Sequence, residues 1–191
     1  MIRTASVLAI LAAAGTASAQ QLSVLLEVDL SVENQVTITA TDGVSAATIT
    51  GSSTVGFYLD NAIDGSAGIG DTLVSGDLTS ASELSDGTPD LFNGFGDGSG
   101  LNVFSYADGG ASSNFTAGEI AFSGSGTWDI SAAAYASFAA PGTTGLIYFP
   151  ADDDGDLAGA EILGELIIVP APVAGALLAM GGLVAVRRRR A

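Results

Sequence analysis

The amino-acid sequence predicts an all-β protein, a β-sandwich of jelly-roll or immunoglobulin-like type, flanked by an N-terminal signal peptide and a C-terminal membrane helix. Short runs of alternating apolar and polar residues recur along residues 20–166, as in half-buried strands. Turn signals separate these runs, and the chain holds 26 glycines. The two ends, residues 1–19 and 167–191, are instead apolar and contain all five basic residues.

Residues 1–19 have the three parts of a secretory signal peptide. Arg3 supplies the positive charge, Val7–Ala14 is the apolar stretch, and Ala17-Ser18-Ala19 is a small-residue cleavage site. We therefore expect signal peptidase to cut after Ala19, so that the mature chain begins at Gln20. An uncleaved membrane helix is the alternative, which the short apolar stretch disfavours.

The first part of residues 20–166 predicts a β-hairpin followed by further strands. Residues Ser23–Val32 and Gln35–Thr41 both alternate between apolar and polar side chains, with a turn at Glu33-Asn34 between them. Asp42-Gly43 marks the next turn. The strands expected after it are Ala46–Thr50 and Thr54–Leu59.

The second part predicts loops, then more strands. Residues Asp60–Gly100 are rich in Gly, Asp and Ser, with short apolar pieces at Leu73-Val74 and Leu91-Phe92. Ala132–Ala139 stays open, because alanine favours a helix whereas its aromatic residues allow a strand. The remaining expected strands are Leu101–Tyr106, Glu119–Phe122, Gly126–Ile130, Gly145–Phe149 and Glu161–Val169. About eight to ten short strands favour the sandwich, and a β-solenoid is the alternative.

Residues 167–191 combine a proline pair, an apolar run and a basic end. The uncharged run Val173–Val186 would span about 21 Å as a helix, less than a hydrocarbon core of ~30 Å. Snorkelling arginines and local thinning of the bilayer can cover the difference. The basic end, which would stop transfer through the membrane, is expected on the cytoplasmic side and consists of Arg187, Arg188, Arg189 and Arg190. A buried C-terminal helix with a solvated basic end is the alternative.

The segment Val169-Pro170-Ala171-Pro172, with the apolar run and the arginines after it, resembles the C-terminal sorting signal of the PEP-CTERM family. Ala171 stands where the Pro-Glu-Pro motif of that family has glutamate. Members of the family are exosortase substrates. The resemblance implies export, transient anchoring in the inner membrane, cleavage near the proline pair by an exosortase-like enzyme, and release to the cell surface or extracellular matrix. It implies nothing about the fold of residues 20–166.

The exported domain, residues 20–166, is acidic and has no basic side chain. All 21 acidic residues lie between Glu27 and Glu165, and no Lys, Arg or His lies between Arg3 and Arg187. This charge repels phosphates, which excludes DNA and RNA as partners, and it attracts cations such as Ca²⁺. Because the chain has no cysteine, the stability of the domain must come from apolar burial and backbone hydrogen bonds.

The missing residue types also exclude most catalytic machinery. A domain without His, Cys or Lys has no Ser-His-Asp or Cys-His nucleophile, no thiolate or imidazole zinc site and no Schiff base. Carboxylate pairs remain, as in glycosidases, but the sequence does not place two of them across a cleft. We therefore expect no enzyme, and a secreted carboxylate-based hydrolase is the least favoured function.

The densest acidic cluster lies in residues 152–156. Asp152, Asp154 and Asp156 have the alternate spacing of calcium loops, and Glu161 is a candidate distal ligand. An EF-hand loop would have glycine at position 157 and glutamate at position 163, where this chain has leucine. A solvated acidic turn is therefore the alternative to a weak Ca²⁺ site.

Three further motifs have ordinary interpretations. Residues 93–98 are glycine-rich with one aspartate, which is more typical of a flexible loop than of a cation site. Asn114-Phe115-Thr116 matches a glycosylation acceptor, but we expect a chance match beside a sorting tail of this kind. Trp128 shares a strand face with Ile130, so it is expected in the core rather than in a sugar-binding platform.

These features predict an exported structural or interaction protein of the cell surface or extracellular matrix. The alternative is a surface-displayed carbohydrate- or calcium-binding module. The expected partners are signal peptidase, an exosortase-like enzyme, the inner membrane and extracellular polysaccharide. No cofactor is expected apart from Ca²⁺.

Overall fold

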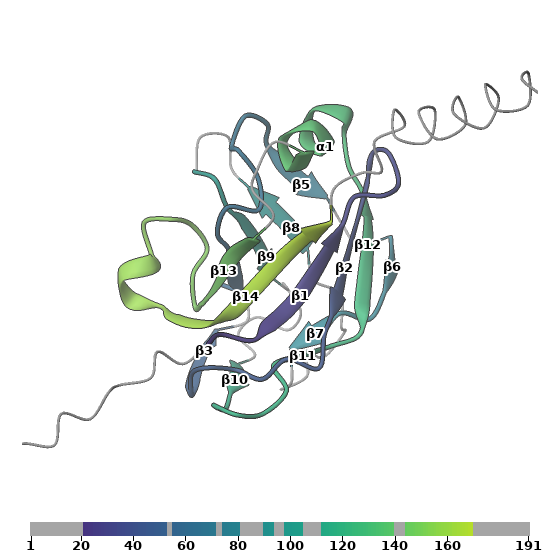
Figure 1. Ribbon diagram of the computed structural model, residues 1–191. Coiled ribbons are helices and arrows are strands. Elements are labelled where there is room, and N and C mark those ends of the chain that lie inside the picture. Colours follow the sequence, from purple (N-terminus) through teal and green to yellow (C-terminus); the bar gives the residue numbers. More distant parts are fainter. Residues whose placement is uncertain are drawn as a thin grey trace, which may run out of the picture.

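The computed structural model describes residues 21–52, 55–71, 74–80, 90–93, 98–104, 112–139 and 144–169. These residues form mainly strands, with one α-helix and one short 3₁₀ helix (Figure 1). The β-rich part of the predicted fold class is thereby confirmed. None of the helices in these ranges has the length and apolar character needed to cross a membrane.

The predicted sorting elements lie almost wholly outside the described residues. Of the Val-Pro-Ala-Pro motif, only Val169 is described, as the last residue of a strand. The predictions that fall outside are those for the cleavage site, the proline pair and the basic stop: Ala17, Ala19, Gln20, Pro170, Ala171, Pro172, Arg187, Arg188, Arg189 and Arg190.

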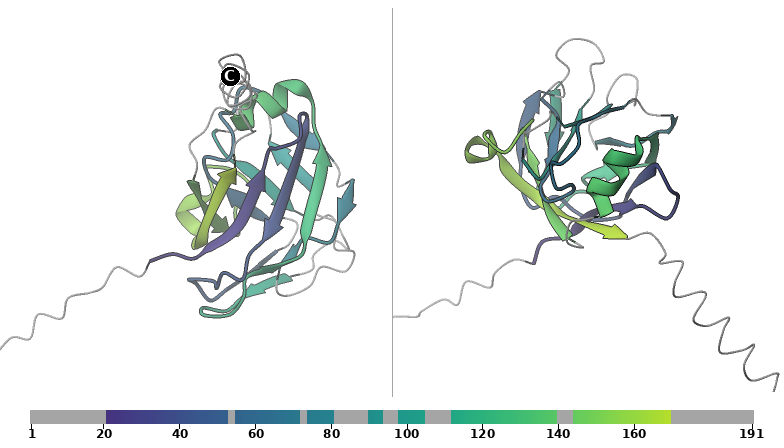
Figure 2. Two further views of the ribbon diagram at one scale, coloured as in Figure 1. Left: turned by 45° about the vertical axis from the view of Figure 1, so that its right-hand side comes forward. Right: turned by 90° about the horizontal axis from the view of Figure 1, so that it is seen from above.

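Ten of the described strands form one sheet, in the order β5-β8-β9-β4-β13-β14-β1-β2-β12-β6. The sheet curls around the core, as the two views of Figure 2 show. Its strands are β1 (Val24–Asp29), β2 (Gln35–Ala40), β4 (Phe57–Leu59), β5 (Ile69–Asp71), β6 (Ser75–Gly76), β8 (Asp90–Asn93), β9 (Leu101–Phe104), β12 (Ser125–Asp129), β13 (Thr144–Phe149) and β14 (Glu161–Val169). Two small antiparallel ladders pair β3 (Ile49–Ser52) with β10 (Ser112–Phe115), and β7 (Thr79–Ser80) with β11 (Phe122–Ser123).

Strands β1 and β2 form the predicted hairpin. They pair antiparallel, with Leu26 opposite Ala40 and Val28 opposite Ile38. Of the apolar residues in the alternating pattern, Leu26, Val28, Leu30, Val36 and Ile38 are buried, whereas Val32, beyond the end of β1, is exposed. The polar residues Glu27 and Thr39 are exposed as expected. The turn between the strands places Asn34 at φ 59°, a left-handed conformation that asparagine tolerates better than most residues.

Residues Ala132–Ala139, which the sequence left open, form helix α1. The Ser131 hydroxyl accepts a hydrogen bond from the Ala134 N–H at 3.1 Å and so caps the first turn. Ala134 and Phe138, one helical turn apart, are both buried. The helix is therefore selected by its cap and by one apolar face.

Several strand predictions need correction. Residues 60–100, expected to be mainly loops, contribute β5, β6, β7 and β8 to the sheets. Expected strand Glu119–Phe122 contains only an isolated bridge from Ile120 to Val44 and the first residue of β11. Strand β10 lies where no strand was expected. These elements are short, and cross-strand partners rather than local pattern decide their state.

The core is one apolar cluster inside the curled sheet. Trp128 on β12 is fully buried, as expected. Four phenylalanine rings pack in a chain with centroid distances of 4.8 to 5.4 Å: Phe57, Phe122, Phe115 and Phe149. Aromatic pairs in this range add to the stability gained from apolar burial.

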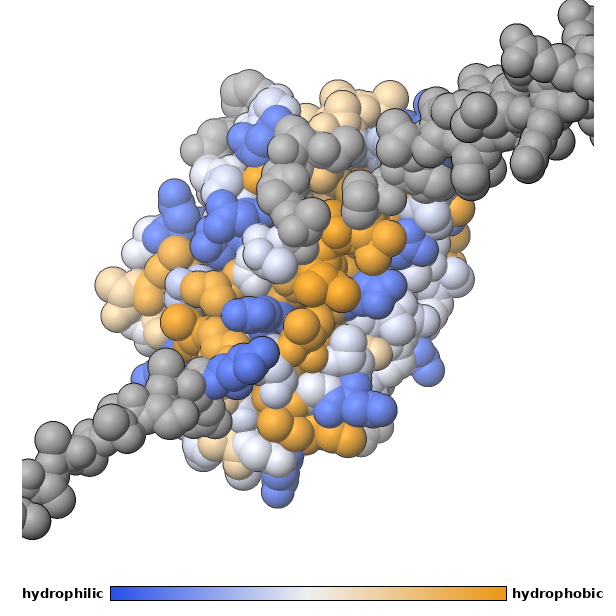
Figure 3. Space-filling view, viewed as in Figure 1, coloured by the Kyte–Doolittle hydropathy of each residue, from blue (hydrophilic) through white to orange (hydrophobic). Residues whose placement is uncertain are grey.

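The outer face of β13 and β14 is partly apolar as well. Leu146 and Tyr148 on β13, and Ile162 and Ile167 on β14, are half-buried on this side. Figure 3 shows hydrophobic residues gathered over this part of the sheet, with hydrophilic residues between them. The outer faces of β2 and β12 differ, because their side chains there are Gln, Thr, Ser and Asp.

Strand β14 fixes where the chain enters and leaves the sheet. It pairs antiparallel with β13 and parallel with β1. Because β1 and β14 run in the same direction, the chain enters at one end of the sheet and leaves at the other (Figures 1 and 2). The exit end is closed by a hydrogen bond of 3.2 Å from the Leu30 N–H to the Val169 carbonyl. Helix α1 lies at the same end, where the Tyr135 hydroxyl donates to the Leu30 carbonyl at 2.6 Å.

Candidate cation site in the 150–160 loop

The acidic cluster lies in the loop that joins β13 to β14. Phe149 and Glu161 face each other in the register of these strands, so the loop begins and ends at one point of the sheet. That point is the start of β14, at the opposite end of the strand from Val169. The short 3₁₀ helix Leu157–Gly159 completes the loop.

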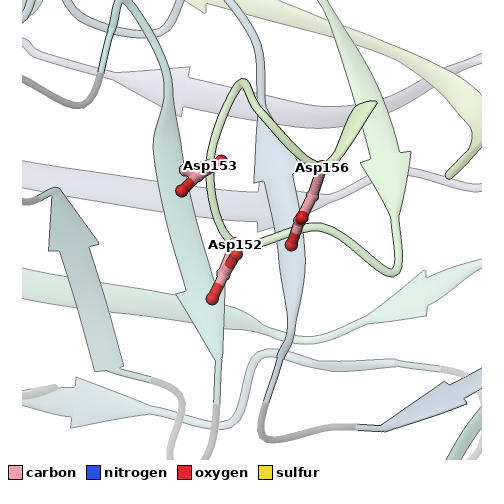
Figure 4. A group of neighbouring side chains, drawn as sticks. All are labelled: Asp152, Asp153 and Asp156. Atoms are coloured by element: carbon pink, nitrogen blue, oxygen red, sulfur yellow. The ribbon is translucent and has the colours of Figure 1, made fainter. Parts of the chain in front are cut away.

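Three carboxylates of this loop lie together. One oxygen each of Asp152, Asp153 and Asp156 lies within 4.8 Å of the others (Figure 4). A local turn produces the arrangement, because Asp153 Oδ1 accepts the Gly155 N–H at 2.6 Å. The Asp156 N–H lies 3.4 Å from the Asp153 carbonyl, which closes the turn. The cluster is thus a group of hard oxygen donors on a short, hydrogen-bonded turn.

The group differs from the ligand set expected from alternate spacing. Asp152 and Asp156 belong to it as expected, but Asp153 takes the place of Asp154. The Asp154 carboxylate instead lies beside Gly98, with Oδ2 at 2.7 Å from where a glycine Cβ would stand. Glu161 is exposed as the first residue of β14 and does not join the group. The turn at Asp153 breaks the extended geometry that alternate spacing presumes.

The pKa of Asp152 shows how crowded these charges are. A hydrogen bond with the Asp156 side chain raises the pKa of Asp152 above its ordinary 3.8, and burial and the charges of Asp156 and Asp153 raise it further. A raised carboxyl pKa means that the protonated form is favoured in the folded state. No basic side chain exists among the described residues to neutralise the group.

The base of the loop is tied to the neighbouring strands. Asn102 on β9 is buried, and its Nδ2 donates to the carbonyls of Ala151 at 3.0 Å and Val55 at 2.8 Å. The Ala151 N–H donates to the Gly56 carbonyl at 3.3 Å. The residues just before β4 are therefore joined to the start of the acidic loop by the Asn102 amide and by one backbone hydrogen bond.

Tyr58 on β4 lies beneath the same region, and sequence reasoning did not single it out. Its side chain is 1% exposed, and its hydroxyl has no hydrogen-bond partner among the described residues. Burial raises the pKa of Tyr58 to about 12, with the charges of Asp154, Asp60 and Asp153 adding to the rise. The Gly100 backbone amide opposes this rise without reaching hydrogen-bond geometry.

The other motifs give no second site. Residues 94–97 of the glycine-rich segment lie outside the described ranges. Asn114 lies on β10, where its Oδ1 accepts a hydrogen bond from the Thr50 hydroxyl at 2.6 Å. Trp128 is buried and offers no platform to a sugar.

In comparisons with known proteins, no family model, no curated protein and no solved structure matches this chain.

The acidic loop predicts an unusual pH dependence. Because the folded pKa of Asp152 is raised, its contribution to stability is fully present below the unfolded pKa and is lost as pH rises through the folded pKa. We expect the melting temperature to fall as pH rises above about 4, and to fall less in Asp152→Asn. Thermal melts of both chains across this range measure the difference. A wild-type melting temperature that rises relative to that of Asp152→Asn would contradict the assignment.

Proposed function

We propose that this chain is exported and acts as a structural or interaction protein of the cell surface or extracellular matrix, sorted by its PEP-CTERM-like C-terminal signal. The separation of charge along the chain supports this proposal most. All five basic residues lie in the two apolar ends, and all 21 acidic residues lie between them. Such a pattern fits a body that crosses the membrane while both basic ends stay on the cytoplasmic side.

The exit point of the chain agrees with this arrangement. β14 has nine residues, which span about 30 Å of strand. The acidic loop lies at its start, and the proposed anchor follows its end at Val169. In an anchored precursor, the most acidic loop would therefore be held away from anionic lipid, which repels it.

For the domain itself, we propose a sandwich-like classification of the jelly-roll or immunoglobulin-like kind. The two arms of the curled sheet would serve as its two layers. Residues of β4 and β9 share one core cluster with residues of β2 and β12, which supports this classification.

The proposed partners follow from the sorting signal and from the surface. Signal peptidase and an exosortase-like enzyme would process the ends, with the inner membrane as the transient anchor. Extracellular polysaccharide is the proposed partner of the released domain. The half-buried apolar residues on the outer face of β13 and β14 support an interaction role, since such patches often mark contact surfaces.

The basic stop is the part of this proposal that a substitution tests directly. Replacing Arg187–Arg190 by serine is expected to move precursor out of the membrane fraction, because the positive charge that holds the tail on the cytoplasmic side is lost. The matched control replaces the same four residues by lysine, which keeps the charge and is expected to keep the precursor in the membrane. Fractionation followed by immunoblotting measures both. Equal membrane fractions in the serine and lysine variants would reject the anchor.

A further inference from the structure

Val32 is an exposed apolar residue whose position the packing of the domain does not explain. The alternating pattern of residues 23–32 groups it with the buried side chains, yet it is 55% exposed. It lies in the turn between β1 and β2, where the Gln35 N–H donates to its carbonyl at 3.2 Å. Turns favour Gly, Pro, Asn, Asp and Ser rather than a β-branched apolar residue. A contact outside the domain would account for valine at this place.

The opposite end of β1 and β2 shows how exposed apolar residues are otherwise arranged. Ile120 is 50% exposed and Val44 is 38% exposed, but these two residues form an isolated bridge. Residues that face each other in this way have neighbouring side chains, so each covers part of the other. Val32 lies beyond the registered pairs of β1 with β2, and no strand residue in the described part of the chain stands opposite it.

Val32 lies at the exit end of the domain. The Leu30 N–H donates to the carbonyl of Val169, which is the last residue of β14 and is 36% exposed. Helix α1 adjoins the same turn, because the Ile130 N–H donates to the Asn34 carbonyl at 3.0 Å and the helix begins two residues later (Figure 1). The eight residues of the helix carry no charge. The exit end therefore presents an apolar turn beside an uncharged helix.

Acidic residues of β1, β12 and the turn lie around Val32. Asp29 accepts hydrogen bonds from the backbone N–H and the hydroxyl of Ser31 at 2.7 and 3.1 Å. Asp129 accepts a hydrogen bond from the Gln35 side chain at 2.9 Å. Glu33 is exposed in the turn itself. These carboxylates would be repelled by anionic lipid, so the turn fits a zwitterionic surface better than an anionic one.

The length of chain after β14 limits how far the exit end can stand from a membrane that holds the apolar run Val173–Val186. Val173 follows Val169 by four residues, which span at most about 14 Å. The headgroup layer on each side of a bilayer is about 5–8 Å thick. Because the apolar run is also shorter than the hydrocarbon core, the mismatch draws the domain toward the bilayer. The exit end is thus held at the headgroup layer or only a few ångströms beyond it.

We propose that the exit end of the domain rests on the membrane surface in the anchored precursor, with Val32 placed among zwitterionic lipid headgroups. This proposal rests on the anchor of the proposed function and adds to it the surface that meets the lipid. Apolar side chains of interfacial segments reach about 5–10 Å into the boundary between headgroups and acyl chains. Val169 lies beside the turn and shares the contact, whereas the acidic loop at the start of β14 lies at the far end of that strand.

Labelling of single cysteines tests the contact, because the chain has no cysteine of its own. Precursors with Val32→Cys or Ile120→Cys are labelled with an environment-sensitive fluorophore and reconstituted in phosphatidylcholine vesicles. We expect the emission of the label at position 32 to shift to shorter wavelength and to be quenched by lipids that carry a spin label near the headgroup. The label at position 120 replaces a residue of similar exposure at the opposite end and is expected to keep its emission in water.

Flotation of the same vesicles separates the contact from the anchor on which it rests. A precursor that does not float with the vesicles has no anchor, which would reject the anchor and the contact together. A precursor that floats while the label at position 32 remains as accessible to water as the label at position 120 would keep the anchor and overturn the contact. A shifted label that spin-labelled lipid does not quench would indicate a second copy of the chain at this surface and would also overturn the contact. Circular dichroism checks that each variant is folded.

Discussion

Replacement of Trp128 by alanine is expected to lower the free energy of unfolding by about 3–5 kcal/mol. The side chain is fully buried on β12, opposite Val36 of β2. Its loss would leave a cavity in the apolar core that neighbouring side chains cannot fill without moving. The melting temperature should fall by roughly 10 °C. Since domains of this kind are stable by only about 5–15 kcal/mol, the variant would be close to unfolding.

The neighbouring residue supplies the control. Thr127 is half-buried on the outer side of the same strand, and its hydroxyl bonds that of Thr37 at 2.9 Å. Thr127→Ala is expected to cost about 1 kcal/mol, the value of one such hydrogen bond. Urea unfolding followed by circular dichroism compares the two variants. Equal losses would mean that Trp128 is not part of the core.

Asn102→Ala is expected to have the second-largest effect, a loss of about 2–4 kcal/mol in unfolding free energy. The substitution removes the donor from the buried Ala151 carbonyl and the partly buried Val55 carbonyl, and an enclosed carbonyl without a donor costs about 1–3 kcal/mol. It also releases the start of the acidic loop from β9. Denaturant unfolding followed by circular dichroism measures the loss.

Asn114→Ala is the matched control for this change. Asn114 is exposed on β10, where its side chain accepts a hydrogen bond from the Thr50 hydroxyl. Its removal is expected to cost less than about 1 kcal/mol, because water can replace the lost contacts of an exposed side chain. If Asn102→Ala behaved in the same way, Asn102 would not be the tie between loop and sheet.

The sequence predicted those strands in which the alternation of apolar and polar residues is long enough to distinguish a buried face from an exposed one. The β1–β2 hairpin is confirmed because five or more alternating residues mark its inner side, and β14 because its nine residues are mainly apolar. Strands β5, β6 and β7 were missed because strands of two or three residues, made of Gly, Ser, Thr and Asp with a single isoleucine, show no period. Their state depends on partners far along the chain, as where Ser75 pairs with Thr127.

The order of strands in the sheet could not be predicted either. Placing β14 between β13 and β1 brings the last strand beside the first, a non-local pairing that leaves no local mark. Helix α1 was left open because alanine favours a helix whereas Tyr135 and Phe138 allow a strand. The Ser131 cap and the burial of Ala134 and Phe138 on one face decide in favour of the helix.

The sequence predicted which loop holds the carboxylates but not which of them lie together. The run of aspartates marked the loop, yet one hydrogen bond from Gly155 to Asp153 decides which carboxylates meet. Tyr58 lies in a strand with buried neighbours on both sides, so its sequence context indicates only a strand. Its position beneath the loop follows from the pairing of β4 with β13 and β9, which no local pattern contains.

The parallel pairing of β1 and β14 also decides how this domain would bear a mechanical load. If the domain is tethered through Val169 and pulled from its N-terminal end, the force draws the two strands past each other along their length. The hydrogen bonds of the five registered pairs are then strained together, in shear, rather than opened one after another as in a zipper. In that direction of pull, the pairing of β1 with β14 resists extension until all of its hydrogen bonds break together.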